Sequence, residues 1–307
     1  MARLDVAVAV VKNEKGQILI SQRKLDAHQG GLWEFPGGKF EKNETAHQAL
    51  VRELKEELNI TAVTSIPLIN ISFDYPTVNV RLHVRVVECF TGSVKSLEGQ
   101  LYKWVDESQL TDYLFPEANQ GILKAIGLTR HYPIINSSDI KEVLIRVDSL
   151  AEQGISLLQI RAKELLEGDV EQFFSQLEER CAQLGLDYLI NSAVIRGDQY
   201  KGGVHLTSYD LMNVNSRPEC KGYVAASCHN LKELQHAEVI GVDFVVLSPI
   251  KETKSHPGAE LLGWERFEQL VAQVNIPVFA LGGLGESDLD QSLAAGSQGL
   301  SGISLYN

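Results

Sequence analysis

Three glutamates lie close together in the stretch GKFEKNETAHQALVRELKEELNI, residues 38–60. Glu53, Glu56 and Glu57 are spaced i, i+3 and i+4, so on a helix their carboxylates would share one face. Like charges at this spacing repel by roughly a few tenths of a kcal/mol per pair, which does not help folding. A hard divalent cation would remove the repulsion, because Mg²⁺ takes carboxylate oxygens and keeps waters and substrate phosphates as its other ligands. The spacing therefore predicts a metal-assisted phosphate site.

The segment that carries these glutamates has the pattern of an amphipathic helix over residues 44–58. It contains no proline or glycine. Its apolar residues repeat at helical spacing: Ala46, Leu50, Leu54 and Leu58. Asn59 follows, and Asn tolerates the left-handed conformation that commonly ends a helix. Arg52 lies next to the cluster, and we expect it to orient one carboxylate through a charged hydrogen bond.

The same stretch resembles the signature of the Nudix hydrolases, which cleave a nucleoside diphosphate linked to another group. The signature is Gly, five residues, Glu, seven residues, Arg-Glu-apolar, one residue, Glu-Glu, one residue, Gly-apolar. This chain matches it from Gly38 to Ile60, with Asn59 in place of the last glycine. The resemblance implies an α/β/α sandwich with a mixed sheet over residues 1–128. The alternative interpretation is a solvated, charge-rich helix without a ligand.

The resemblance extends to the MutT branch of that family, which removes oxidised guanine nucleotides from the precursor pool. Three blocks carry it: SQRKLDAHQGGLWEFPGGK at 21–39, LEGQ at 97–100 and FPEAN at 115–119. It implies Mg²⁺ or Mn²⁺ as cofactor, with Glu53 or Glu98 as the general base. The implied metal ligands and catalytic groups are the Gly37 carbonyl and the carboxylates of Glu53, Glu56, Glu57 and Glu98. The implied nucleotide-binding residues are Arg23, His28, Phe35, Gly37, Gly38, Lys39 and Asn119.

Asn119 offers a physical basis for selecting the base. Guanine presents two acceptors, O6 and N7, whereas the 8-oxo base carries a proton on N7. One amide can therefore donate to O6 and accept from N7–H, and a buried mismatch costs about 1–3 kcal/mol. We expect hydrolysis of 8-oxo-dGTP to the monophosphate and pyrophosphate. Ordinary roles stay open for these residues: a helix cap for Asn119, a core position for Phe35, and a surface loop for His28 and Glu98.

The second half of the chain changes to short apolar runs that alternate with helical segments. The runs expected to be strands are 133–136, 157–160, 188–191, 203–206, 223–226, 244–247, 278–281 and 299–302. The helical segments are 139–153, 170–184, 230–240, 263–274 and 287–295. This alternation predicts a TIM-type (β/α)8 barrel over 134–307, joined by a linker at 129–133. Because little chain follows the last strand, the barrel lacks a full last helix, and the first domain or a second subunit would have to cover that gap.

Polar residues follow the ends of these strands, where the active site of such a barrel is built. Gln159, Arg161 and Lys163 alternate, so they point the same way. The other candidate ligand-binding residues are Asn191, Asp210, His229, Gly282 and Gly283. The half resembles the thiamine phosphate synthase and TenI family, which implies thiazole or thiamine phosphate as the ligand.

One departure from that family bears on its chemistry. Ser192 stands where the synthases place an Asp, which leaves Asp210 as the remaining carboxylate of an expected metal pair. Three interpretations therefore stay open: synthase chemistry, a metal-free thiazole tautomerase that uses His229, and a barrel that binds a phosphate or serves as a scaffold.

Charge and composition exclude some classes of binding partner and indicate the compartment. Residues 1–130 carry 15 basic and 16 acidic side chains, whereas residues 131–307 carry 13 and 24. A strongly acidic half argues against a nucleic-acid polymer, which needs basic surface. No run of 18 apolar residues occurs, so no membrane span is expected. The four cysteines show neither metal spacing nor a disulfide pattern, which favours the cytoplasm.

Two interpretations of the whole chain follow. The first is a hydrolase that cleans the nucleotide pool and so protects DNA from mutation, with an appended barrel of open activity. The second is a thiamine-pathway enzyme whose first half hydrolyses a thiamine-related diphosphate. A third interpretation is a ligand sensor without hydrolysis. The intact glutamate cluster argues against it, because a sensor needs no metal-activated water.

Overall fold

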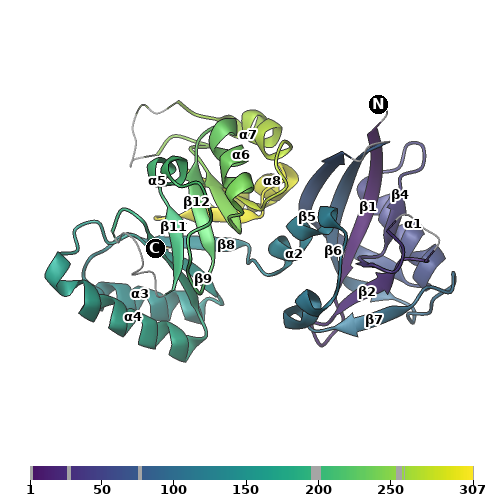
Figure 1. The fold of residues 1–307 in the computed structure, drawn as a ribbon, viewed down its shortest axis with the longest axis horizontal. Helices are drawn as coiled ribbons and strands as arrows, with labels where there is room; N and C mark the ends of the chain where they lie inside the picture. The colour runs from purple at the N-terminus through teal and green to yellow at the C-terminus, as the bar shows by residue number, and fades with distance from the viewer. Residues whose placement is uncertain are drawn as a thin grey trace. The chain divides into compact units, whose positions relative to one another are not determined.

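A computed structural model describes residues 3–25, 29–74, 78–194, 202–253, 258 and 260–306 (Figure 1). The chain divides into two compact units, Met1–Gly127 and Leu128–Asn307, and each is described by itself. His28, one of the predicted nucleotide-binding residues, lies outside the described residues. In the described part of the chain, no helix combines the length and apolar content that crossing a membrane requires.

A mixed sheet forms the centre of the first unit. Its strand order is β4 (Gly37–Lys39), β1 (Arg3–Val11), β6 (Asn79–Thr91) and β5 (Thr61–Asp74). β1 pairs in parallel with β6 and antiparallel with β4, and β5 pairs antiparallel with β6. A smaller sheet has the order β3 (Trp33–Glu34), β2 (Ile18–Gln22) and β7 (Tyr102–Val105). The helical segments are α1 (Ala46–Leu58), α2 (Gln120–Ile126), η1 (Glu107–Asp112) and η2 (Glu117–Asn119).

The alternation of side chains along β1 places a helix on each face of this sheet. Ala7 and Ala9 pack in one cluster with Leu50 and Leu54 of α1. Val8 and Val10 pack in another cluster, with Ile122 and Ile126 of α2. Successive strand residues point to opposite faces, so both clusters follow from the sequence of one strand. The predicted α/β/α sandwich with a mixed sheet is confirmed.

The second unit is a closed barrel of parallel strands. Its strands in chain order are β8 (His131–Ile135), β9 (Leu157–Ile160), β10 (Asp187–Asn191), β11 (Gly203–Leu206), β12 (Val224–Cys228), β13 (Phe244–Leu247), β14 (Val278–Leu281) and β15 (Gly299–Gly302). Its helices are α3 (Ile140–Glu152), α4 (Val170–Leu184), α5 (Ser208–Asn213), α6 (Leu231–Ile240), α7 (Gly263–Val271) and α8 (Leu289–Ala294), with short turns η3 (Glu167–Asp169) and η5 (Glu286–Asp288). Figure 1 shows α3 and α4 side by side. The predicted barrel is confirmed.

The structure differs from the sequence prediction at both ends of the barrel. β8 begins at His131, so residues 131–133, expected in a linker, belong to the first strand. The reason is Tyr132, which is fully buried inside the barrel. After β15, Leu305 and Tyr306 pack against the two clusters between the strands and the outer helices. The hydroxyl of Tyr306 donates to the carbonyl of Leu300 at 3.1 Å. The chain itself therefore covers part of the gap that was assigned to another domain or subunit.

Candidate functional sites

Helix α1 begins and ends where its sequence dictates. Thr45 caps its first turn by accepting from the backbone N–H of Gln48, and the Gln48 side chain accepts from the N–H of Thr45. Asn59 ends the helix in the left-handed conformation, with φ of 58°. The buried face contains Ala49, Leu50, Leu54 and Leu58. The opposite face therefore carries the glutamates, as their spacing predicts.

Arg52 of α1 holds several acidic groups at once. Its Nε and Nη2 donate to the two carboxylate oxygens of Glu44 at 2.8 and 2.9 Å. Nη1 donates to Glu53 at 2.8 Å and to Glu56 at 3.2 Å. Nη2 also donates to the carbonyl of Lys39 at 2.9 Å. The expected orientation of one carboxylate by Arg52 is present, and it extends to three carboxylates and the end of β4.

Gly38 makes room for the carboxylate of Glu53. A Cβ atom at Gly38 would lie 2.2 Å from Cδ and Oε1 of Glu53 and 2.4 Å from Oε2. Real Cβ atoms do not approach other atoms so closely, so any side chain at 38 would push the Glu53 carboxylate away. Gly37 has φ of +152°, and its Cβ would lie 2.0 Å from the carbonyl oxygen of Ala7 in β1. The glycine pair thus fits α1 and β1 against β4.

Glu57 is the most perturbed acid of this group. Burial, and then the negative charges of Glu53, Glu34 and Glu98, raise the pKa of Glu57 to about 8. The backbone N–H of Gly37 donates to Glu57 and opposes this rise. The charges of these three residues act on Glu57 because carboxylates from α1, β3 and the loop after β6 lie in one region. The loop is held there because Leu97 N–H donates to the Glu57 carbonyl at 2.9 Å.

The donor chemistry of this acidic group fits a hard divalent cation. Carboxylate oxygens are the ligands that Mg²⁺ takes, and a cation would remove the repulsion that acts on Glu57. In the described residues, however, no three acidic, histidine or cysteine side chains are already arranged around a metal position. Cations of the protein hold them instead: Arg52 holds Glu53 and Glu56, and Lys24 contacts Glu98 at 3.2 Å. Metal binding therefore needs these side chains to turn, and the roles of the Gly37 carbonyl and of each carboxylate stay predictions.

Some of the predicted nucleotide-binding residues of the first unit have side-chain partners within the described part of the fold, and the buried side chain of Asn119 forms no hydrogen bond there. Arg23 pairs with Glu34 of β3, and burial raises the pKa of that glutamate. Phe35 is 3% exposed and its ring stacks on Phe115, with centroids 5.2 Å apart, so it is a core residue. The exposed fraction of Asn119 is 7%, and its side chain does not cap α2. The helix-cap role of Asn119 is therefore wrong, and its amide stays available for another partner.

Two of the predicted ligand-binding residues, Gln159 and Arg161, lie at the end of β9, at the mouth of the barrel. Gln159 is buried in the strand, and its Nε2 has no hydrogen-bond partner among the described residues. Arg161 follows the strand, and burial lowers the pKa of its guanidinium. No described residue forms an ion pair with it, whereas its charge reaches His205 of β11. Lys163 is exposed farther out. A half-buried guanidinium without a carboxylate is typical of an anion site.

Asp210 is held by hydroxyl groups. Its carboxylate accepts from Ser192 Oγ and from Thr207 Oγ1, the latter at 2.7 Å. Ser192 Oγ also accepts from Thr207 N–H at 2.9 Å, and Asn191 Oδ1 accepts from Ala193 N–H at 3.1 Å. Ser192 thus contacts Asp210 directly at the place of the expected second carboxylate. These residues do not fit a metal pair.

His229 and the glycine pair lie at other strand ends of the barrel. Nδ1 of His229 lies 3.0 Å from the carbonyl oxygen of Ser248, which can only accept, so Nδ1 carries the proton. Nε2 is then left as an acceptor. Gly282 and Gly283 have φ of +110° and +64° after β14, and a Cβ at Gly283 would lie 2.2 Å from the carbonyl oxygen of Glu252. The glycines let this turn pack against the loop after β13.

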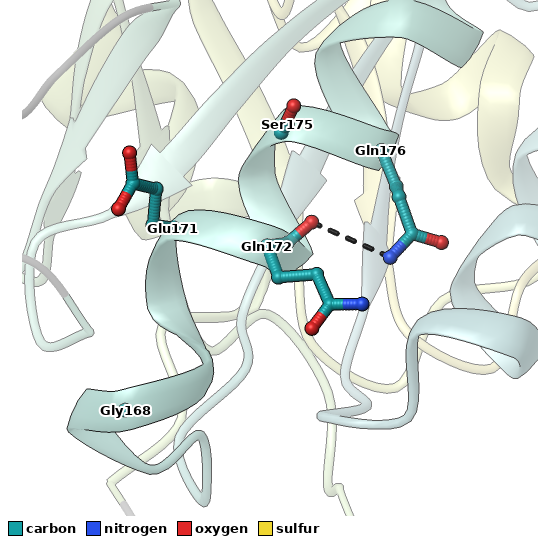
Figure 2. A pocket seen from close by; sticks show the side chains of 5 residues that line it. All are labelled: Gly168, Glu171, Gln172, Ser175 and Gln176. Atoms are coloured by element: carbon teal, nitrogen blue, oxygen red, sulfur yellow. Dashed lines mark hydrogen bonds between the residues drawn. The ribbon is translucent and has the colours of Figure 1, made fainter.

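A surface hollow on α4 lies apart from the predicted site residues (Figure 2). It is lined by Gly168, Glu171, Gln172, Ser175 and Gln176. Nε2 of Gln176 donates to the backbone carbonyl of Gln172, one turn earlier in α4, at 3.5 Å. With Glu171 as its charged group, the hollow has no chemistry that favours phosphate.

Comparison with known proteins identifies both units. A family model described as a NUDIX domain matches residues 7–125, and one described as thiamine monophosphate synthase matches residues 131–305. The 8-oxo-dGTP diphosphatase of Escherichia coli is 37% identical over 40% of this chain and 95% of its own length. The chain belongs to both families.

Other relatives show the range of substrates among similar proteins. The Nudix unit is 34% identical to the CTP pyrophosphohydrolase of Escherichia coli, over 42% of this chain and 96% of that protein. The thiamine monophosphate synthase unit is 29% identical to a thiamine-phosphate synthase of Desulfitobacterium hafniense, over 53% of this chain and 81% of that protein. Identity at this level assigns the families and leaves the substrate of each unit to be proposed.

Sequence reasoning missed several residues of these two sites. Glu34 was noticed as part of a similar block, but its charge near Glu57 was not. In the synthase unit, Tyr132 and Ser227 contact the two ring nitrogens of His205. The strand alternation that places all three inside the barrel could have found them.

Proposed function

We propose that the Nudix unit hydrolyses 8-oxo-dGTP to 8-oxo-dGMP and pyrophosphate with Mg²⁺ or Mn²⁺. Such a reaction removes a mutagenic nucleotide from the cytoplasmic pool that supplies DNA replication. The observation that carries the proposal is Glu57 beside the Gly37–Gly38 turn, where burial and then the negative charge of the neighbouring carboxylates raise its pKa to about 8. This charge is unfavourable for the fold and favourable for a bound cation.

The residues of the unit have distinct tasks in this reaction. A bound divalent ion would neutralise the phosphates and lower the pKa of an attacking water. Glu53 is 15% exposed and is fixed by Arg52 and by the space at Gly38, so we assign it the role of general base. Glu98 is half exposed and paired with Lys24, which suits a group that changes partner when substrate binds.

Base selection is assigned to the amide of Asn119. Its side chain is buried, does not cap α2 and forms no hydrogen bond with the described residues. An amide can donate to O6 and accept from the proton on N7 of the oxidised base, whereas guanine would place a lone pair against the amide oxygen. The mismatch disfavours guanine by about 1–3 kcal/mol.

A substrate panel tests this assignment. The full chain is incubated with 8-oxo-dGTP, dGTP, CTP and thiamine diphosphate, each with and without Mg²⁺, and released pyrophosphate or phosphate is measured. We expect 8-oxo-dGTP to give the highest kcat/KM and Glu53→Gln to lower it by about 10³-fold or more. Preference for CTP would indicate a CTP pyrophosphohydrolase instead, and preference for thiamine diphosphate would indicate an enzyme of a thiamine pathway.

We propose further that the synthase unit binds a phosphate-bearing ligand at the barrel mouth without a metal. Arg161 supports this, because its half-buried guanidinium has no carboxylate partner among the described residues. The hydroxyl-bound Asp210 argues against metal-dependent synthase chemistry. His229, with Nε2 free to accept a proton, suits a tautomerase. Calorimetric titration of the full chain with thiazole phosphate in a chelator should give heat, and absence of heat would favour a scaffold.

A further inference from the structure

The upper layer of the barrel interior contains several polar side chains. Inward-facing side chains alternate along each strand, and near the carboxyl ends the polar ones are Gln159, Asn191, His205, Ser227 and Ser301, beside the apolar Val246 and Leu281. Below them lie apolar residues such as Leu157, Leu189 and Phe279. Polar groups buried at this depth need partners, so their hydrogen bonds can be counted one by one.

Two of these side chains, His205 and Ser227, form a continuous chain of hydrogen bonds with Tyr132. The hydroxyl of Tyr132 lies 3.1 Å from Nδ1 of His205, and Nε2 of the same ring lies 2.9 Å from Oγ of Ser227. Tyr132 and His205 are 0% and 1% exposed, whereas Ser227 is partly open toward the strand ends. Both rings make these hydrogen bonds and no others with the described residues.

The protons of this chain have one satisfied arrangement. Burial lowers the pKa of His205 to about 3 and raises that of Tyr132, so both groups are neutral at pH 7. If Tyr132 donates to Nδ1, Nε2–H donates to Ser227, and no buried donor is left over. In the reverse order, the Tyr132 hydrogen would have no acceptor among the described residues, since the rings of Phe244 and Phe279 pack against the Tyr132 ring. A buried orphan donor disfavours that tautomer on the order of tenfold or more.

We propose that Tyr132 and His205 are positioning residues that keep the Ser227 hydroxyl hydrogen directed at the barrel mouth. Because Ser227 accepts from Nε2–H, its own hydrogen is free to bond an acceptor oxygen of the ligand, as in a phosphate or carboxylate. The donor groups of Gln159 and Arg161 lie in the same upper region, which favours an anionic group there. This inference rests on the ligand-binding role proposed for the barrel.

The tautomer of His205 tests the positioning role without any ligand. In the full chain labelled with ¹⁵N, we expect the His205 ring to carry its proton on Nε2. Tyr132→Phe keeps the ring and removes the partner of Nδ1, so either tautomer then leaves Nδ1 unpartnered and the population with the proton on Nδ1 should rise. Tyr306→Phe, which removes a hydroxyl outside the barrel, should leave it on Nε2. A wild-type proton on Nδ1, or no change in Tyr132→Phe, would overturn the proposal.

Titration with inorganic phosphate in a chelator tests the consequence for binding. Ser227→Ala and Tyr132→Phe should each weaken phosphate binding about five- to tenfold, although Tyr132 does not reach the mouth. The double variant should bind no more weakly than either single variant, because both remove the same donor. Additive losses would contradict the relay. If wild-type protein binds no phosphate, the proposed ligand is wrong, and the tautomer measurement alone decides the positioning role.

Discussion

Substitution of Gly38 by alanine tests the most demanding contact of the Nudix site. The added Cβ would lie 2.2 Å from the Glu53 carboxylate, whereas an ordinary contact begins at 3.4 Å. The carboxylate must therefore move by about 1.2 Å, and a misplacement of about 1 Å costs on the order of 10²-fold in rate. We expect kcat to fall by about 10²-fold, or roughly 2.7 kcal/mol in transition-state free energy.

Stability should change little in Gly38→Ala. The displaced atoms are the end of a flexible side chain, and replacing glycine by alanine stabilises by about 0.4–1 kcal/mol through the unfolded state. That gain offsets part of the weakened contact with Arg52. Gly37→Ala is the matched control, because its Cβ would meet the backbone oxygen of Ala7 at 2.0 Å. It should destabilise the Nudix unit by on the order of 3 kcal/mol or more.

Two measurements separate these effects. Pyrophosphate release is followed with the nucleotide that the wild type cleaves fastest, and the stability of each unit is followed by hydrogen exchange. The reasoning is refuted if Gly38→Ala retains wild-type kcat, or if it unfolds as readily as Gly37→Ala. A fall in kcat with native hydrogen exchange supports it.

Further predictions concern both units. Arg52→Lys should lower kcat about 10- to 100-fold, because a lysine cannot reproduce the fork that holds Glu44, and steady-state kinetics would show it. Asn119→Ala should reduce the preference for 8-oxo-dGTP over dGTP by about 5- to 150-fold, measured by competition. Since the folded-state pKa of His205 is lowered to about 3, the barrel should lose about 1.4 kcal/mol per pH unit as pH falls below 6.5. Urea unfolding at pH 7 and 5 checks this, and His205→Gln should abolish the slope. Tyr306→Ala should destabilise the barrel by about 1–2 kcal/mol, seen in barrel amide exchange, through loss of its bond to Leu300.

The strands of the barrel were predictable because each is buried on both sides. Such strands are short runs of apolar residues, and 157–160, 203–206, 244–247, 278–281 and 299–302 match the observed bounds. β5 was missed because Thr61–Asp74 mixes polar residues, contains Pro67 and has several register shifts. α5 was missed because its six residues span fewer than two turns, too few to show helical periodicity.

The active groups of the Nudix unit were predictable in type and only partly in arrangement. Helical spacing alone places Glu53, Glu56 and Glu57 together. It does not show that Glu57 is partly buried or that Glu34 adds its charge, because those facts come from the packing of β3 and the loop after β6 against α1. Likewise, Tyr132 and His205 are 73 residues apart, and barrel closure brings them into contact.

The two units collect ligand groups of opposite polarity, which gives a final prediction. The Nudix unit gathers carboxylates around Glu57 and needs a cation before an anionic substrate can approach. The barrel mouth offers the guanidinium of Arg161 without a metal pair. A chelator should therefore abolish nucleotide binding and leave phosphate binding by the barrel unchanged, and Arg161→Met should do the reverse. Isothermal titration of the full chain with each ligand measures both, with Lys163→Met as the control for a cation that is exposed farther out. Loss of both nucleotide binding and phosphate binding in the chelator would show that the barrel, too, depends on a metal.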